Sequence, residues 1–182
     1  QIALGVVCLF ANVANAQVTE NFNSTLPSCY SIENTTVQNG AVFLPNNTTV
    51  NGVDATVHIK TPYFDFTATS VTVTFSYSFP DKVNGNKSRT FRIGTENQNG
   101  VISYSNDLRV GNKNVPIIEV TNGSLTATVT ATFNVSVSST QRIVITYNGD
   151  GGPVKGTFDD LTVNSNYHYT NPCNTRPVAT NN

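Results

Sequence analysis

Apolar and polar residues alternate along most of the chain with a period of two, which is the pattern of β-strands that bury one face. Residues 71–79 carry Val, Phe or Tyr at every second position, and residues 125–137 continue this pattern over a longer run. The second run exceeds an average strand, so we expect it to bend or to pass between two sheets. We predict further strands near residues 18–22, 41–44, 56–60, 90–95, 101–105, 115–119, 142–147 and 156–163.

The turns between these runs support an all-β fold. Asn-Gly dipeptides favour turns with positive φ, and they begin at Asn39, Asn51, Asn84, Asn99, Asn122 and Asn148. No stretch shows the spacing of an amphipathic helix. About nine strands, each with one apolar face, must pack as two sheets. The sequence therefore predicts an antiparallel two-sheet β-sandwich with jelly-roll topology, and a closed barrel is the second choice.

Composition restricts the partners of this domain. The chain has 182 residues and a net charge of −1, and charged residues make up 12% of it. This balance provides no basic surface for nucleic acid or for an anionic membrane. Asn and Thr supply many of the polar positions instead, as expected for strands joined by turns.

The N-terminal segment has the pattern of a secretory signal. Residues 2–13 are mostly apolar and too few to span a membrane, and Ala14-Asn15-Ala16 has the small-x-small pattern of a signal-peptidase site. We predict a signal peptide over residues 1–16, with export across the inner membrane to the cell surface or the medium. The alternative is a buried N-terminal helix. The folded domain would then cover residues 17–173, and residues 174–182 would form a linker.

Two cysteines remain in the predicted mature chain, because Cys8 falls in the signal. Cys29 lies near its start and Cys173 near its end. In an exported protein this pair favours one disulfide that ties the two ends together, and the alternative is two unbridged thiols. A zinc site is disfavoured, because no Cys-x-x-Cys or nearby His spacing accompanies them.

Two adjacent carboxylates interrupt the apolar run near the C-terminus. Strict alternation over residues 156–163 places Asp159 on the face of Leu161 and Val163, and Asp160 on the face of Phe158. Two inward residues outweigh one, so we predict that Asp159 is the buried carboxylate. A buried carboxylate needs a partner. That partner is either a hard cation such as calcium or the hydrogen bonds of an ordinary structural Asp.

Several short motifs resemble a known family. They are Glu20-Asn21-Phe22, Leu26-Pro27-Ser28-Cys29-Tyr30, Thr61-Pro62-Tyr63-Phe64-Asp65-Phe66 and Phe158-Asp159-Asp160-Leu161. Together they resemble the secreted jelly-roll domains at the N-terminus of large multidomain surface proteins of Gram-negative bacteria. Those domains are similar in turn to carbohydrate-binding modules, MAM-like domains and cleaved-adhesin domains.

The resemblance implies a structural calcium ion (Ca2+) shared by an early acidic residue and the late Asp pair. Carried over by residue, the ligands are Glu20 and Asp159, with Asp160 as the alternative. Many relatives have Trp where this chain has Tyr30, and the chain contains no Trp. The segment 176–181 looks like the opening of cadherin-like or Ig-like repeats, which would be partners within the same chain.

The function expected from the sequence is non-catalytic. We rank a structural or adhesive module of a surface protein first, and a carbohydrate-binding module second. A glycoside hydrolase is a remote alternative, because the adjacent Asp pair points to opposite faces and cannot flank one bond. Tyrosine has an apolar face and a polar tip, which suits a glycan. The candidate ligand-binding residues are Tyr30, Tyr63, Tyr104, Tyr167 and Tyr169.

Overall fold

The computed structural model describes residues 16–23, 26, 29–79, 89–105, 117–120, 126–137, 139–149 and 155–169. The predicted signal (apart from Ala16), the predicted linker and Cys173 lie outside these residues. The strands are β1 (Ala16–Glu20), β2 (Ser31–Glu33), β3 (Val37–Gln38), β4 (Ala41–Leu44), β5 (Thr49–Val50), β6 (Val53–Asp54), β7 (Val57–Phe66), β8 (Ser70–Ser78), β9 (Arg89–Asn97), β10 (Ile102–Tyr104), β11 (Ile117–Val120), β12 (Thr126–Asn134), β13 (Thr140–Gly149), β14 (Gly156–Ser165) and β15 (Tyr167–Tyr169).

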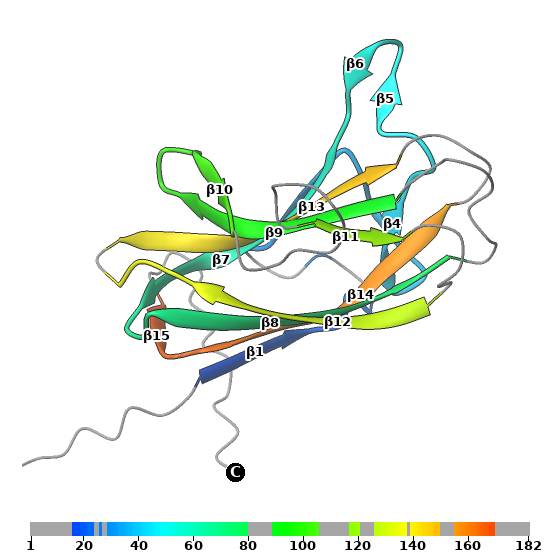
Figure 1. Cartoon of the computed structure of the whole chain (residues 1–182). Coiled ribbons are helices and arrows are strands. Elements are labelled where there is room, and N and C mark those ends of the chain that lie inside the picture. Colours follow the sequence, from blue (N-terminus) through cyan, green and yellow to red (C-terminus); the bar gives the residue numbers. More distant parts are fainter. Residues whose placement is uncertain are drawn as a thin grey trace, which may run out of the picture.

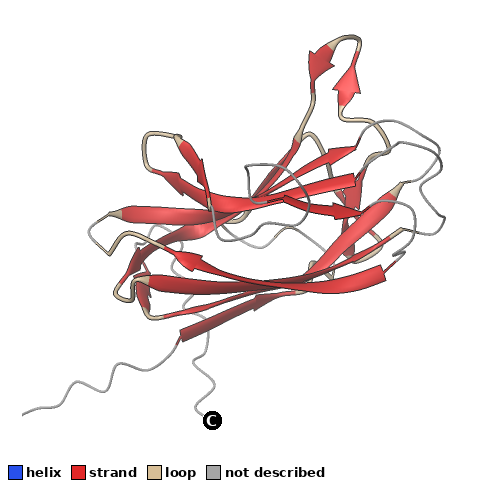
Figure 2. Cartoon of the chain, in the orientation of Figure 1, coloured by secondary structure: helices blue, strands red, loops and turns tan. Residues whose placement is uncertain are grey.

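Two antiparallel sheets pack face to face (Figures 1 and 2). The six-stranded sheet has the order β12-β8-β14-β4-β3, and β1 also pairs with β14. The seven-stranded sheet has the order β10-β9-β13-β7-β15, with β11 paired to β9 and β2 paired to β7. Successive long strands from β7 to β9 and from β12 to β15 lie in opposite sheets, as in a jelly roll. The predicted all-β sandwich is confirmed, although the short strands raise the number above nine.

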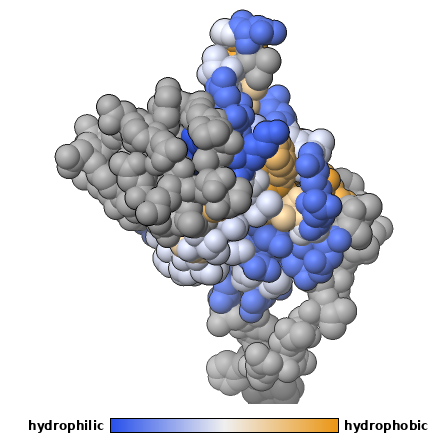
Figure 3. All heavy atoms as spheres, turned by 90° about the vertical axis from the view of Figure 1, so that its right-hand side faces the viewer, coloured by the Kyte–Doolittle hydropathy of each residue, from blue (hydrophilic) through white to orange (hydrophobic). Residues whose placement is uncertain are grey.

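The hydrophobic core lies between the two sheets and is rich in aromatic rings. Phe75 packs on Phe158 of its own sheet with ring centroids 4.9 Å apart, and on Phe91 of the opposite sheet at 5.3 Å. All three side chains are fully buried. Tilted and stacked ring pairs of this kind add to the free energy gained from burial. The described surface shown in Figure 3, at the end where β4 and β14 meet, is mostly hydrophilic with a narrow apolar band. No helix capable of spanning a membrane occurs within the described ranges.

Asn-Gly dipeptides form two of the tight turns as predicted. Asn39-Gly40 joins β3 to β4, and Asn51-Gly52 joins β5 to β6. Both residues of each pair have positive φ, between 50° and 82°. This is the geometry of the hairpin turns that favour Asn-Gly. Asn99-Gly100 also lies in a turn, between β9 and β10, where Gly100 has a φ of 78°. Asn148-Gly149 belongs to the end of strand β13.

The long alternating run near the middle of the chain remains in one sheet. Strand β12 pairs with β8 from Thr126 to Asn134 without a register shift. The predicted bend or passage between sheets within this run is therefore wrong for these residues. Exposed hydroxyls on one side and Ala131 and Phe133 on the core side keep the strand regular.

A β-bulge resets the alternation of β14. The register against β8 shifts after Asp159, and Asp160 has a φ of 53°. Phe158 and Leu161 can therefore both be buried, whereas Asp159 is half-buried and Asp160 is exposed. The prediction that Asp159 shares a face with the apolar residues after it is wrong, because it assumed an uninterrupted strand.

Candidate binding face on the seven-stranded sheet

The outer face of the seven-stranded sheet carries most of the charged side chains that the described strands hold. On β13, Ile143 and Ile145 belong to the core, so Arg142 and Thr146 point the other way. The pairing register places Arg142 between Glu96 of β9 and Tyr63 of β7. Figure 1 shows the β5–β6 hairpin and β10 rising above this sheet, on the side away from the six-stranded sheet.

A second β-bulge builds this face. The register of β7 against β13 shifts so that Lys60 pairs with Val144 and Tyr63 pairs with Arg142. Residues three positions apart would point to opposite faces in a regular strand, but the bulge brings Lys60 and Tyr63 to the same side. Pro62 has no N–H to donate, and the Thr61 hydroxyl serves the opposite strand in its place: it accepts from the Ile143 N–H at 2.9 Å and lies 3.5 Å from the Ile143 carbonyl oxygen. The bulge therefore keeps its buried hydrogen bond.

One buried carboxylate joins two cations at the centre of the face. Glu96 Oε1 accepts a hydrogen bond from the Arg142 Nη2 at 2.8 Å, and Glu96 Oε2 lies 3.1 Å from the Lys60 Nζ. The Lys60 Nζ also lies 2.5 Å from Glu33 Oε1. To reach Glu96 from β7, the Lys60 side chain crosses β13 at Val144. Val144 is fully buried although it lies outside the core cluster, as expected for a residue that pairs with a long side chain lying across its strand.

Two tyrosines lie at the edges of this charged centre, and each carries a guanidinium group on its ring. The Arg142 guanidinium lies 4.8 Å from the Tyr63 ring centroid, and that of Arg92 lies 4.6 Å from the Tyr104 ring centroid. The Tyr104 hydroxyl lies 2.9 Å from the Thr146 hydroxyl. Both distances to the rings fall within the range of cation–π contacts, which hold planar groups in place.

Each of the two guanidinium groups keeps a donor without a partner. The Nε–H of Arg92 and that of Arg142 are buried and make no hydrogen bond within the described part of the chain. The Arg142 Nη1 donates to the Ser31 hydroxyl at 3.3 Å. A buried donor that lacks an acceptor costs free energy, so part of the hydrogen-bonding capacity of each guanidinium is given up where it packs on its tyrosine ring.

The charges on this face keep Glu96 ionised. Burial acts to raise the pKa of Glu96, but hydrogen bonds and positive charge from Arg142 and Lys60 outweigh it, so the pKa lies below its ordinary value. His58 lies nearby, with its Nδ1 3.4 Å from the Thr146 hydroxyl. Burial lowers the pKa of His58, and Lys60 adds to this effect against the opposing charge of Glu33. The face therefore holds a carboxylate and a mainly neutral imidazole at neutral pH.

Gly94 lets β10 approach β9 closely enough to place Tyr104. A Cβ atom at position 94 would lie 2.2 Å from the Ser103 carbonyl oxygen and 2.8 Å from the Tyr104 Cα. Both contacts are with backbone, which has no room to move aside independently. The close approach explains why a strand that is otherwise rich in large side chains has Gly at this position.

Four of the five tyrosines predicted to bind a ligand have described side chains, and these four separate into two groups. Tyr63 and Tyr104 lie on the outer face as described. Tyr30 and Tyr167 are each only 9% exposed and belong to the core, where they pack on Phe22 and Phe64. Their prediction as ligand-binding residues is corrected, because a core ring offers no face to a ligand. The side chain of Tyr169 lies outside the described part of the structure.

The acidic residues predicted to hold calcium are neighbours in the six-stranded sheet. Glu20 pairs with Leu161, directly after the Asp pair. Glu20 Oε1 accepts a hydrogen bond from the Phe22 N–H at 2.8 Å, and Asp160 Oδ2 accepts one from the Ser76 hydroxyl at 2.9 Å. Burial raises the pKa of Asp159, and the charge of Asp160 adds to this. Within the described ranges, no three His, Cys, Asp or Glu side chains are grouped to hold a metal ion. Calcium therefore stays a prediction.

Only one cysteine of the predicted disulfide lies within the described residues. Cys29 is disulfide-bonded. The other two cysteines, Cys8 and Cys173, lie outside the described residues. The partner is thus not identified, and the bond between Cys29 and Cys173 stays a prediction.

Sequence analysis missed the charged residues of the face, although a signal for them exists. Charged residues are scarce in this chain, yet Lys60, Arg92 and Arg142 each stand next to a core residue within a strand. Alternation places such side chains on the outer face. Several outward charges on one sheet are informative in a chain with so few charged residues, because clustered ionisable groups often mark a functional face. Which strands lie side by side, however, follows only from the sheet order.

No family model matches the sequence, and no curated protein matches it either. The fold is shared with solved structures. The K1 cleaved adhesin domain of Lys-gingipain from Porphyromonas gingivalis W83 gives a TM-score of 0.54 at 9% identity, over 83% of this chain and 99% of that chain. The K3 cleaved adhesin domain of the same protein gives a TM-score of 0.54 at 10% identity, over 84% of this chain and 99% of that chain.

A xylan-binding domain, CBM22-1 of Paenibacillus barcinonensis Xyn10C, gives a TM-score of 0.48 at 9% identity, over 84% of this chain and 96% of that chain. This score is too low to support an argument. The likeness to the two adhesin domains shows the fold alone, because the identities are low. The chain therefore has a jelly-roll β-sandwich fold similar to that of cleaved adhesin domains, and its predicted position in a large multidomain protein stays a prediction.

Proposed function

We propose that this domain is a non-catalytic binding module that holds a glycan on the outer face of the seven-stranded sheet. The observation that carries the proposal is the gathering of Tyr63 and Tyr104 around the ion-paired centre of Lys60, Glu96 and Arg142. A glycan has apolar ring faces and many hydroxyls. Half-buried tyrosines supply apolar contact, and fixed charged groups supply strong hydrogen bonds to hydroxyls. The ion pairs also hold these groups in place before a ligand arrives.

The chemistry of this face favours binding over hydrolysis. A glycosidase needs a protonated carboxylic acid and a second carboxylate facing the same bond. Glu96 is held ionised by Arg142 and Lys60, so it is a poor proton donor at neutral pH. Glu33 contacts the same lysine and serves as its second partner. The solved neighbours with the higher scores are named as adhesin domains, which agrees with a binding role.

The proposal is tested by a glycan array followed by affinity measurements. We expect the 182-residue chain to bind at least one class of glycan. Tyr63→Ala and Tyr104→Ala should each weaken that binding at least tenfold, which corresponds to about 1.4 kcal/mol. His168→Ala, at an exposed position of the same sheet, serves as the control and should bind like the parent. If the chain binds no glycan on the array, the proposal is contradicted and the structural or adhesive role remains.

Calcium at the Asp pair is a separate hypothesis. Its support is the family resemblance and the pairing of Glu20 with Leu161, which places Glu20 next to the Asp pair along the sheet but on the side of the core residue Leu161. Calcium takes carboxylate and backbone oxygen ligands, so backbone carbonyls would have to complete the site. The ion would neutralise the adjacent carboxylates and hold β1 on β14.

Removing calcium should then lower the melting temperature of the domain. Only an ion that binds the folded state stabilises it, so excess calcium should restore the original value and magnesium should restore it less. The measurement is thermal unfolding in chelator, with Glu20→Gln as a variant whose melting temperature should no longer respond to calcium. An unchanged unfolding curve in chelator would remove the calcium hypothesis.

We further propose that the module is exported and precedes other repeats of the same chain. The predicted signal over residues 1–16 and the predicted linker over residues 174–182 support this placement. The fold likeness to adhesin domains is compatible with a secreted or cell-surface protein. Mass spectrometry of the exported protein tests the first part, since the predicted mature chain starts at Gln17.

A further inference from the structure

The outer face of the six-stranded sheet is lined with hydroxyls and carries one exposed ring. Thr126 of β12 pairs with Ser78 of β8, Ser78 pairs with Thr157 of β14, and Thr157 pairs with Phe43 of β4. Residues that pair in this way share a face, so the four side chains form one row across the sheet. The neighbours Val42 and Leu44 are buried in the core on the opposite side.

Phe43 is unusual at this place. It is half-buried, and it is the one aromatic side chain among the described residues of this face. The other outward residues of β8 and β12 are Ser, Thr and Asn. Core packing does not require an aromatic ring here, because Phe43 lies outside the core cluster. A single apolar side chain on a polar face is common, so Phe43 becomes informative through the pocket that lies beside it.

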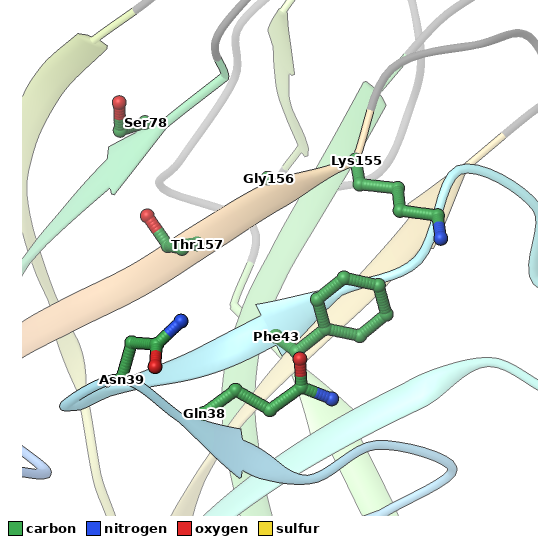
Figure 4. Close-up of a pocket in the computed structure, with 7 residues that line it drawn as sticks. All are labelled: Gln38, Asn39, Phe43, Ser78, Lys155, Gly156 and Thr157. Carbon is green, nitrogen blue, oxygen red and sulfur yellow. The ribbon is translucent and has the colours of Figure 1, made fainter.

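A pocket of about 410 Å³ opens beside this ring, within the size range of small-molecule sites. Figure 4 shows the side chains of Gln38, Phe43 and Lys155 gathered on one side of it, with Ser78 and Thr157 on the other. Asn39 contributes from the β3–β4 turn, where its positive φ of 50° fixes its position. The lining thus combines one ring with two amides, two hydroxyls and one ammonium group.

Several of these polar groups have capacity for a ligand. The Asn39 amide and the Thr157 hydroxyl make no hydrogen bond within the described residues. The Lys155 Nζ lies 5.6 Å from the centroid of the Phe43 ring. No described carboxylate lies within salt-bridge distance of this ammonium group. Among the described residues of the lining, Lys155 is the one that carries a charge, and that charge is positive.

We propose that this pocket is a second saccharide site, specific for sugars that carry a carboxylate, such as uronic acids. The apolar face of a sugar ring would pack on Phe43, the amides and the Thr157 hydroxyl would exchange hydrogen bonds with its hydroxyls, and Lys155 would pair with the carboxylate. The hydroxyl row toward Ser78 and Thr126 continues the surface for a longer chain. The site lies on the opposite sheet from the face around Tyr63, so the two proposals are independent.

Nuclear magnetic resonance (NMR) titration of the 182-residue chain tests this site, with trigalacturonate and its carboxyl-reduced form, galactotriose, as probes. Trigalacturonate should shift the amide signals of residues 38–43 and 155–157. Phe43→Ala and Phe43→Leu should each weaken its binding at least tenfold. Lys155→Gln should reduce its affinity to that of galactotriose. Thr130→Ala, on the same face but outside the pocket, is the control and should bind like the parent.

Three results would overturn the proposal. One is equal affinity for the acidic and the reduced trisaccharide. Another is no binding of trigalacturonate or of the corresponding glucuronate and mannuronate oligosaccharides. The third is a set of shifted signals confined to Tyr63, Tyr104 and their neighbours, which would place the ligand on the other sheet. Thermal unfolding of both Phe43 variants checks that the fold is intact, and the leucine variant keeps the bulk of the side chain.

Discussion

Replacing Glu96 with Gln is expected to destabilise the domain by about 3–5 kcal/mol, the cost of removing one partner from a buried ion pair. The Glu96 side chain is only 5% exposed, and it contacts both Arg142 and Lys60. The neutral amide would leave two cations close together with much of their charge unbalanced. Lys60 keeps Glu33, so we expect the lower end of this range. Thermal unfolding should show a fall in melting temperature on the order of 10 °C.

Glu33→Gln is the matched control, because Glu33 contacts the same lysine but its side chain is 47% exposed. An exposed ion pair contributes about 1 kcal/mol or less, so this variant should unfold nearly like the parent. Equal losses from the two variants would show that Glu96 is not the central partner, and no loss from either would contradict the description of the face.

The effect of Glu96→Gln should also depend on pH. The pKa of Glu96 in the folded protein lies below its ordinary value, so folding favours the ionised form. The stabilisation is therefore complete above the pKa of the unfolded chain, about 4.3, and is lost as the pH falls through the lower folded value. The difference in unfolding free energy between parent and variant should be full at neutral pH and shrink below about pH 4.

Gly94→Ala is expected to destabilise the domain by about 1–3 kcal/mol through overpacking. The new methyl group would lie 2.2 Å from the Ser103 carbonyl oxygen, so β10 would have to move away from β9. The sign of the change in unfolding free energy distinguishes this steric clash from an ordinary Gly→Ala substitution. Where space and backbone permit, Gly→Ala stabilises a protein by about 0.4–1 kcal/mol through the unfolded state.

The displacement should also change the environment of Tyr104. Its hydroxyl contact with Thr146 and its ring contact with Arg92 depend on the close approach of β10. NMR signals of the Tyr104 ring report this directly. Ser103→Ala is the control, because the exposed side chain is lost while the backbone contact is unchanged. Stabilisation by Gly94→Ala would show that β10 does not pack as closely as described.

Alternation predicted the long strands well because each buries one face only. A strand was predicted over residues 71–79, and the observed strand β8 begins and ends one residue earlier. The predicted strand at 142–147 lies inside β13. Some strands of two or three residues, such as β2 and β3, were missed, whereas the three-residue β10 lies within the predicted strand at 101–105. The missed strands are too short for a period of two to be recognised, and they form because a neighbouring strand offers unpaired backbone groups.

The candidate face could be predicted only in part. Tyr63 and Tyr104 were identified by residue type, but their partners were not. The face depends on the bulge after Lys60, which brings residues three positions apart to the same side. A single strand does not reveal where a bulge falls, because the register is decided with its neighbour. The prediction of which face Asp159 occupies was wrong for the same reason, because the bulge at Asp160 shifts the register of β14.

Chemical-shift mapping with the most tightly bound glycan from the array tests the binding face most directly. We expect the ring signals of Tyr63 and Tyr104 to shift, together with the Nε–H signals of Arg92 and Arg142. Each guanidinium lies against one of these rings, so a glycan bound on the rings must change the surroundings of both Nε–H groups. Binding that leaves all four residues unchanged would contradict the account.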